Sequence, residues 1–239
     1  MNKIQVNIEN YIGNELTLFE KAKNWKNYYG SFFMPYLKGD ILEVGAGIGG
    51  TTLILCNGNQ NSWTCLEPDD SLAIEIETLI RKNKLPNYCK VIKGTLSTVS
   101  SDNKYDTIIY IDVIEHIEDD KSEVKLASQY LKEAGTLIVL VPAHQYLFNE
   151  FDTALGHFRR YNKKMLKEVV PEGLKEIEIF YLDSIGLLAS LANKWFLKQS
   201  TPTEKQILFW DNFIITVSKL IDPIISYSLG KTVIGIWKK

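Results

Sequence analysis

Short apolar runs alternate with amphipathic stretches between residues 40 and 141. Each run has the length of a buried strand, and Gly, Pro or Asp follows most of them. The expected strands cover residues 40–44, 62–67, 89–93, 105–111 and 136–141. The expected helices open at 51–55 and cover 71–84 and 119–132. This alternation predicts an open parallel sheet with helices on both faces.

The two ends of the chain depart from this rhythm. Residues 1–38 are rich in aromatic side chains, and the spacing of residues 16–26 predicts a helix. Residues 142–163 have no clean period, and an irregular segment of that length inside a domain is usually functional. Two more strands are expected at 177–183 and 231–237, and two apolar helices at 184–198 and 204–221.

The most informative motif is a glycine-rich turn after the first expected strand, with the sequence Leu42-Glu43-Val44-Gly45-Ala46-Gly47-Ile48-Gly49-Gly50. Glycines allow a sharp turn and a close approach of a ligand at the carboxyl end of a strand. Glu67 ends the second strand, where a carboxylate can accept hydrogen bonds from ribose hydroxyls. The spacing Gly45-x-Gly47-x-x-Gly50 also matches a dinucleotide site, so an NAD-dependent oxidoreductase is one alternative.

Two details favour S-adenosylmethionine over NAD as the ligand. Glu43 stands two residues before the first glycine, and a carboxylate there suits the ammonium group of a methionine moiety. The residues from Asp112 to Ile117 follow the fourth strand, at the mouth of the same expected crevice.

With these motifs, residues 25–141 resemble the class I S-adenosylmethionine-dependent methyltransferases. The glycine turn resembles the first motif of that family, Glu67-Pro68 the second, and Tyr105 to Ile117 the strand-four motif with its Glu-His pair. The third motif usually has an acid after its glycine, but Thr95 stands there in Gly94-Thr95-Leu96, so Thr95 or a backbone group is expected to hold the adenine. The cofactor-binding residues predicted in this way are Tyr28, Tyr29, Glu43, Gly45, Ala46, Gly47, Gly49, Glu67, Pro68, Gly94, Thr95, Leu96, Asp112 and Val113.

The resemblance also implies the fold and its organisation. The expectation is an α/β fold with a Rossmann-like, open, mostly parallel seven-stranded sheet, helices on both faces, an antiparallel last strand and extra C-terminal apolar helices. We predict one domain over residues 1–239, with a helical cap at 1–38, a cofactor-binding core at 39–141 and an acceptor side at 142–239. For Tyr28 and Tyr29, core packing is the alternative to a cofactor contact.

The segment Gly156-His157-Phe158-Arg159-Arg160-Tyr161 resembles a signature of a bacterial small-molecule subgroup of the family. The residues predicted to contact the acceptor are Tyr146, His157, Arg159, Arg160 and Tyr161. Arginine binds carboxylate or phosphate groups bidentately, but an internal ion pair with Asp152 is the alternative. The candidate general bases are His116, His144 and His157, because histidine titrates near neutrality. For His116, capping or packing next to the cofactor is the alternative.

Composition narrows the function classes. Lys and Arg number 27 against 29 Asp and Glu, a net charge of -2, which argues against a nucleic-acid partner. The three cysteines lack metal-ligand spacing, so we predict reduced thiols, a cytoplasmic protein and no bound metal. No apolar run has the length of a membrane span. The C-terminal apolar helices are expected to form a lid, a homodimer face or a membrane-surface contact.

Together these features predict an enzyme that methylates an oxygen or nitrogen of a small molecule, anionic or partly apolar, and releases S-adenosylhomocysteine. A non-catalytic S-adenosylmethionine-binding protein is the second alternative.

Overall fold

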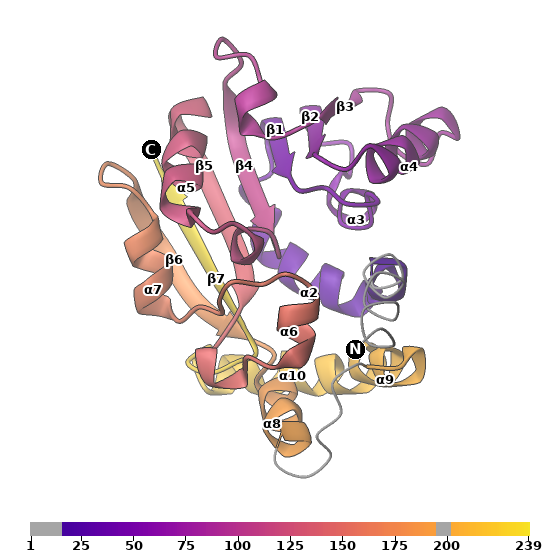
Figure 1. The fold of residues 1–239 in the computed structure, drawn as a ribbon, viewed down its shortest axis with the longest axis vertical. Helices are drawn as coiled ribbons and strands as arrows, with labels where there is room; N and C mark the ends of the chain where they lie inside the picture. The colour runs from indigo at the N-terminus through magenta and orange to yellow at the C-terminus, as the bar shows by residue number, and fades with distance from the viewer. Residues whose placement is uncertain (1–15, 195–201) are drawn as a thin grey trace, which may run out of the picture.

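The computed structural model describes residues 16–194 and 202–239, and its strands form one mixed sheet (Figure 1). Among the described residues the sheet has seven strands in the order β3-β2-β1-β4-β5-β7-β6. The strands are β1 Gly39–Val44, β2 Gln60–Glu67, β3 Cys89–Lys93, β4 Tyr105–Ile111, β5 Leu131–Pro142, β6 Lys175–Leu182 and β7 Thr232–Lys238. β7 runs antiparallel to both of its neighbours, and the other pairings are parallel. The predicted fold class, including the antiparallel last strand, is confirmed.

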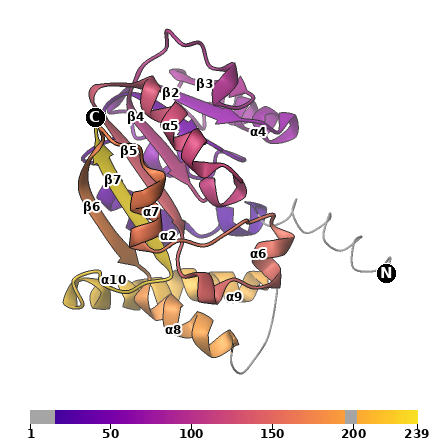
Figure 2. The same cartoon turned by 60° about the vertical axis from the view of Figure 1, so that its left-hand side comes forward.

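Both faces of the sheet are covered, which explains the near-continuous apolar runs of its central strands. Ile109 of β4 packs toward α2 (Lys23–Phe33), α3 (Thr52–Leu55), α4 (Asp70–Arg81) and α10 (Ile215–Ile224). Its neighbour Ile108 packs toward α5 (Asp120–Tyr130) and α7 (Lys163–Val169) on the other face. Figure 2 shows α5 and α7 lying over this second face.

Helix boundaries follow capping groups that the periodicity alone does not reveal. The side chain of Asp69 accepts hydrogen bonds from the backbone N–H groups of Ser71 and Leu72 and begins α4. The predicted helix over residues 16–26 is divided in the structure. Residues 16–20 are helical, the chain turns at 21–22, and α2 begins at Lys23.

The segment that follows β5 contains short elements rather than a plain loop. These are η3 (Gln145–Leu147) and α6 (Glu150–Ala154), after which α7 begins at Lys163. The first residues of the predicted cap and the end of the predicted helix at 184–198 lie outside the described residues.

The C-terminal apolar helices are α8 (Ser184–Ala192), α9 (Glu204–Phe209) and α10, with a π-helical turn, η5 (Trp210–Ile214), joining the last two. Several of their large apolar side chains are exposed, namely Leu188, Phe209, Phe213, Leu220 and Ile224. None of the helices in the described ranges has the length and apolarity needed to cross a membrane. Whether this surface is a lid, a dimer face or a membrane contact stays a prediction.

Candidate active site

The parallel strands bring the sequence motifs to one edge of the sheet. β1 pairs with β2 on one side and with β4 on the other, so the glycine turn, Glu67 and Asp112 all follow the carboxyl ends of adjacent strands. In open α/β sheets this edge is where ligands bind. In the structure, Asp112 has a positive φ of 54°, and partial withdrawal of water raises the pKa of its carboxyl to about 6.

The glycine turn is tied to the second strand through its backbone. The N–H groups of Gly45 and Ala46 donate to the carbonyl of Leu66 at 2.8 and 3.2 Å. The N–H of Gly47 donates to the Glu67 carboxylate at 2.7 Å, and the N–H of Asp69 donates to its other oxygen at 3.0 Å. A carboxylate offers about four lone-pair sites, so Glu67 can still accept hydrogen bonds from a ligand.

Gly47 adopts a φ of 56°, in the left-handed region that favours glycine. Among the residues that the structure describes, a Cβ there would meet only the side chain of Leu16, at 3.6 Å. No described backbone atom therefore crowds this position, and a ligand can approach the turn closely there.

Glu43 lies below the turn and is held by internal partners. One of its carboxylate oxygens accepts hydrogen bonds from the Thr52 hydroxyl at 2.6 Å and from the Trp63 indole at 2.8 Å. Glu43 is 3% exposed, and burial raises the pKa of its carboxyl to about 7. These contacts anchor α3 and β2 to β1, and the predicted ammonium contact stays a prediction.

The remaining predicted cofactor residues differ in position. The Val113 side chain lies against Gly45, where an added Cβ would come within 2.6 Å of it. Pro68 and Thr95 are exposed, and Leu96 is fully buried in the core. The N–H of Gly94 donates to the Glu67 carbonyl at 2.9 Å, so the loop after β3 adjoins the end of β2. Gly49 is buried in the turn, where an added Cβ would lie 3.1 Å from Leu79.

The two adjacent tyrosines of α2 point to different parts of the molecule. The Tyr29 hydroxyl lies 3.1 Å from the hydroxyl of Thr51, at the end of the glycine turn. The Tyr28 hydroxyl instead donates to Asp222 of α10 at 3.0 Å. This buried side chain therefore joins α2 to α10, and the predicted cofactor contact of Tyr28 stays a prediction.

Lys26 is a residue that the sequence motifs did not select. Its side chain is 8% exposed, and its ammonium group donates to the carbonyl of Phe19. An added Cβ at Gly50 would lie 3.7 Å from its terminal methylene. Burial lowers the pKa of Lys26 to about 8, against the attraction of Asp211 and Asp112. A buried lysine beside the glycine turn is available to an anionic ligand group. Its helical spacing marked it only as a packing residue.

On the acceptor side, Asp152 is the centre of a buried ion-pair network. Arg160 donates to its two carboxylate oxygens at 2.8 and 2.9 Å, and His157 Nδ1 lies 2.9 Å from one of them. Burial would raise the pKa of Asp152, but the hydrogen bonds from His157 and Arg160 outweigh it and lower the pKa. Arg160 therefore makes the internal pair that was the alternative to a substrate contact.

Arg159 and Tyr161 clamp this segment onto the residues after β4. Arg159 lies 2.7 Å from Asp120 and donates to the carbonyls of Ile117 and Glu118. The Tyr161 hydroxyl is fully buried and donates to Asp120 at 2.7 Å. Arg160 and Tyr161 are both buried on internal partners, and their predicted acceptor contacts stay predictions. For the partly exposed Arg159 the acceptor contact likewise stays a prediction.

Two of the three histidines meet next to a buried acid. The rings of His116 and His157 are perpendicular, with centroids 4.5 Å apart. Glu115 lies beside them and is fully buried. Desolvation and the neighbouring His157 lower the pKa of His116 to about 4. From the sequence, Glu115 is recognisable only as part of the Glu-His pair, since a buried charge leaves no periodic signal.

His144 has other surroundings. Its Nε2 lies 3.0 Å from the carbonyl of Gly230, and its ring stacks on Tyr146 and Tyr181. The backbone of His144 has a positive φ of 68°. The hydrogen bond and the two stacked tyrosines hold its ring in place. Tyr146 is 52% exposed and remains free to contact a ligand.

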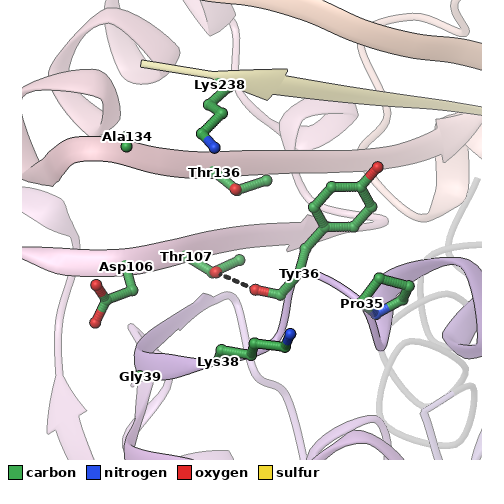
Figure 3. Close-up of a pocket in the computed structure, with 9 residues that line it drawn as sticks. All are labelled: Pro35, Tyr36, Lys38, Gly39, Asp106, Thr107, Ala134, Thr136 and Lys238. Atoms are coloured by element: carbon green, nitrogen blue, oxygen red, sulfur yellow. Dashed lines mark hydrogen bonds between the residues drawn. The ribbon is translucent and has the colours of Figure 1, made fainter.

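A surface hollow of about 270 Å³ lies at the opposite edge of the sheet (Figure 3). Gly39, Asp106 and Thr107 line it where β1 and β4 begin, and the Thr107 hydroxyl donates to the Tyr36 carbonyl at 2.6 Å. None of the predicted site residues lines it, so the candidate active site stays at the carboxyl edge.

Comparison with known proteins agrees with this placement. A methyltransferase domain family model matches residues 18–177. The chain belongs to this family. The family identity and the enzyme class predicted from the sequence are thereby confirmed, and the bacterial subgroup stays a prediction.

Individual relatives are distant. The chain is 23% identical over 187 residues to N-methyltransferase 4 of Papaver somniferum, and the match covers 74% of this chain. It spans about half the length of that curated relative, 49%. Among solved structures, a SAM-dependent methyltransferase from Archaeoglobus fulgidus has a TM-score of 0.61 at 17% identity, covering 94% of this chain and 100% of its own. Phosphoethanolamine N-methyltransferase 2 of Haemonchus contortus, solved with S-adenosyl-L-methionine, has a TM-score of 0.60 at 14% identity, covering 89% and 52%. At these identities the structures support the fold.

Proposed function

We propose that this methyltransferase family member transfers a methyl group from S-adenosylmethionine to a nitrogen or oxygen of a small-molecule acceptor. The observation that carries the proposal is the 2.7 Å hydrogen bond from Gly47 to Glu67. It holds the acid that ends β2 against the glycine turn that ends β1. The names of two relatives, both N-methyltransferases, favour a nitrogen acceptor.

The donor-side residues suit the parts of this cofactor. Glu67 retains lone pairs for the ribose hydroxyls, and Gly47 leaves room above the turn. Lys26 is the buried cation available to the methionine carboxylate, and Glu43 remains the proposed partner of the ammonium group. When bound, S-adenosylmethionine supplies a methyl group that its sulfonium already activates.

The protein itself must therefore position the donor and the acceptor and accept a proton from the acceptor. Holding two reactants in a productive geometry contributes on the order of 7–11 kcal/mol to the barrier reduction. On the acceptor side, His116 and His157 offer ring nitrogens that can take a proton from an amine or hydroxyl. The apolar rings of Tyr146 and Phe158, both about half exposed, offer a surface for the rest of the acceptor.

Titration calorimetry with S-adenosylhomocysteine tests the donor site. Glu67→Ala removes the ribose acceptor, and losing hydrogen bonds to a charged group costs roughly 1.5–3 kcal/mol, which raises Kd by about 10- to 150-fold. Glu77→Ala is the matched control, because Glu77 is a partly exposed acid on α4 whose only described ion pair is with Lys93 at 3.4 Å. An unchanged Kd for Glu67→Ala, or thermal stabilisation by NAD alone, would contradict the proposal.

A second assay addresses the acceptor. The protein is incubated with methyl-labelled S-adenosylmethionine and a panel of amines, phenols and carboxylates, and S-adenosylhomocysteine formation is followed. Turnover on one of these classes supports the proposal. Tight S-adenosylhomocysteine binding without turnover on the panel would support a non-catalytic binding protein instead.

A further inference from the structure

Three ligand-type side chains converge at the carboxyl edge of the sheet. One ligand atom each from Glu115, His116 and His157 lies within 4.8 Å of the other two. The first two follow β4 and the third follows α6, and a 2.8 Å hydrogen bond from the Phe158 N–H to the Glu115 carbonyl joins these segments. Two imidazoles and one carboxylate are a ligand set that binds zinc and ferrous iron in proteins.

Glu115 provides a second, independent observation. Its side chain is fully buried, and neither carboxylate oxygen has a hydrogen-bond partner among the described residues. An ionised carboxylate buried without a partner costs several kcal/mol, and a bound cation removes that cost.

Both histidines also have the supporting contacts that metal ligands use. His157 Nδ1 is held by Asp152, which Arg160 fixes with two hydrogen bonds. The ring of His116 hydrogen-bonds the backbone of Leu155. For His157 the contact through Nδ1 leaves Nε2 for a ligand, and such outer contacts fix the tautomer and orientation of a metal-binding histidine.

From this arrangement we infer that Glu115, His116 and His157 bind a divalent transition-metal ion of the zinc class. Bonds of about 2.1 Å in a tetrahedral site place ligand atoms about 3.4 Å apart, against separations of up to 4.8 Å here, so side-chain rotations that close the cluster by up to about 1.4 Å complete it. Three protein ligands leave a coordination position open, as in catalytic sites. The sequence alone predicts no metal, because His157 is distant in the chain from Glu115 and His116 and carries no spacing signal.

The ion would act on the acceptor, and this step rests on the proposed function. With the ion bound, the histidine nitrogens are ligands and cannot take the acceptor proton themselves. The ion instead makes a coordinated hydroxyl more acidic, and its proton passes to solvent before methyl transfer. The binding itself does not depend on the proposed function, since none of the three ligands lies in the glycine turn or at Glu67.

The test is zinc titration of the tag-free, chelator-treated protein in the absence of cofactor. We expect one Zn²⁺ per chain in the wild type. We also expect Kd to rise at least about 10- to 100-fold in Glu115→Gln, which keeps the shape of the buried side chain. His144→Gln is the matched control, because it removes a histidine outside the cluster and should leave the zinc Kd unchanged. Circular dichroism and an S-adenosylhomocysteine titration check that Glu115→Gln is folded.

Three results would overturn the inference. They are the absence of stoichiometric zinc binding, an equal Kd in Glu115→Gln, and a Co²⁺ absorption spectrum with thiolate character, which would assign the ion to the cysteines. Zinc binding as expected with no S-adenosylhomocysteine binding by the wild type would instead refute the proposed function and leave the metal site standing.

Discussion

The glycine turn after β1 and the segment from Asp152 to Tyr161 adjoin the same edge of the sheet, but they are built in different ways. The turn is held by backbone hydrogen bonds to the neighbouring strand and leaves space at Gly47. The acceptor-side segment is held by charged side chains, with Arg160 on Asp152 and Arg159 on Asp120. A turn held by backbone hydrogen bonds needs glycines at fixed positions, so it can be recognised in the sequence as a motif. A segment held by ion pairs can be recognised only as a group of charged residues, because the sequence does not tell which residues pair.

Gly47→Val should have the largest effect on cofactor binding, because it disrupts the glycine turn. A β-branched residue is strongly disfavoured at a φ of 56°, and its side chain would occupy the space left for the cofactor. We expect S-adenosylhomocysteine binding to fall below detection in calorimetry. Gly58→Ala is the control, since Gly58 also has a positive φ of 95° but no atom of the described residues lies within 4 Å of an added Cβ. It should cost roughly 1–2 kcal/mol of stability and leave Kd unchanged. Normal binding by Gly47→Val would place the cofactor elsewhere.

Arg160→Ala should have the next largest effect, a loss of folding stability, because it breaks the buried ion pair of the acceptor-side segment. Removing one partner of a buried pair leaves Asp152 with an uncompensated charge, which costs about 3–5 kcal/mol. Urea unfolding measures this loss, and S-adenosylhomocysteine affinity should remain at a temperature where the variant is folded. Arg159→Ala is the comparison, since that pair is partly exposed and should cost less. Equal losses of unfolding free energy in the two variants would show that burial does not determine how much each ion pair contributes to stability.

Some elements of the fold could be predicted from the sequence and others could not. The central strands were predictable because a strand covered on both faces must be apolar along its whole length, as β4 is. The break before α2 was not predictable, because the helical spacing continues across residues 21–22.

In the site, Glu67 could be chosen from its position after a strand, since strand ends share one edge of the sheet. Lys26 and Glu115 could not, because their burial depends on tertiary packing and charged residues are usually exposed. Arg160 could be named but not assigned, because arginine serves substrates and internal carboxylates equally well.

Glu43 connects the glycine turn to the core, and a pH titration of stability tests its buried state. Its pKa is raised from 4.5 to about 7 in the folded protein, so the unfolded chain ionises first as pH increases. Between these values the folded state loses stability, by about 3 kcal/mol at 1.36 kcal/mol per pKa unit. Glutamine can keep both hydrogen bonds without a charge. The unfolding free energy of Glu43→Gln relative to wild type should therefore increase from pH 4.5 to 7 and stay level above pH 7. A constant difference across this range would show that Glu43 is not the group that titrates.

The smallest expected effect comes from substituting the two adjacent tyrosines of α2. Comparing the two variants tests which of them belongs to the donor site. Tyr28→Phe removes one hydrogen bond to Asp222, which still accepts bonds from the N–H groups of Asp183 and Ser184 at 2.9 and 3.0 Å. Because Asp222 is not left unpaired, the loss of stability should be about 1 kcal/mol, a typical value for one hydrogen bond. The Kd for S-adenosylhomocysteine should not change, since the Tyr28 hydroxyl does not reach the turn. Tyr29→Phe is the matched variant, because it removes the contact with Thr51 next to the turn and should raise Kd measurably. If Tyr28→Phe weakened cofactor binding as much as Tyr29→Phe, the donor side would extend across α2 to α10.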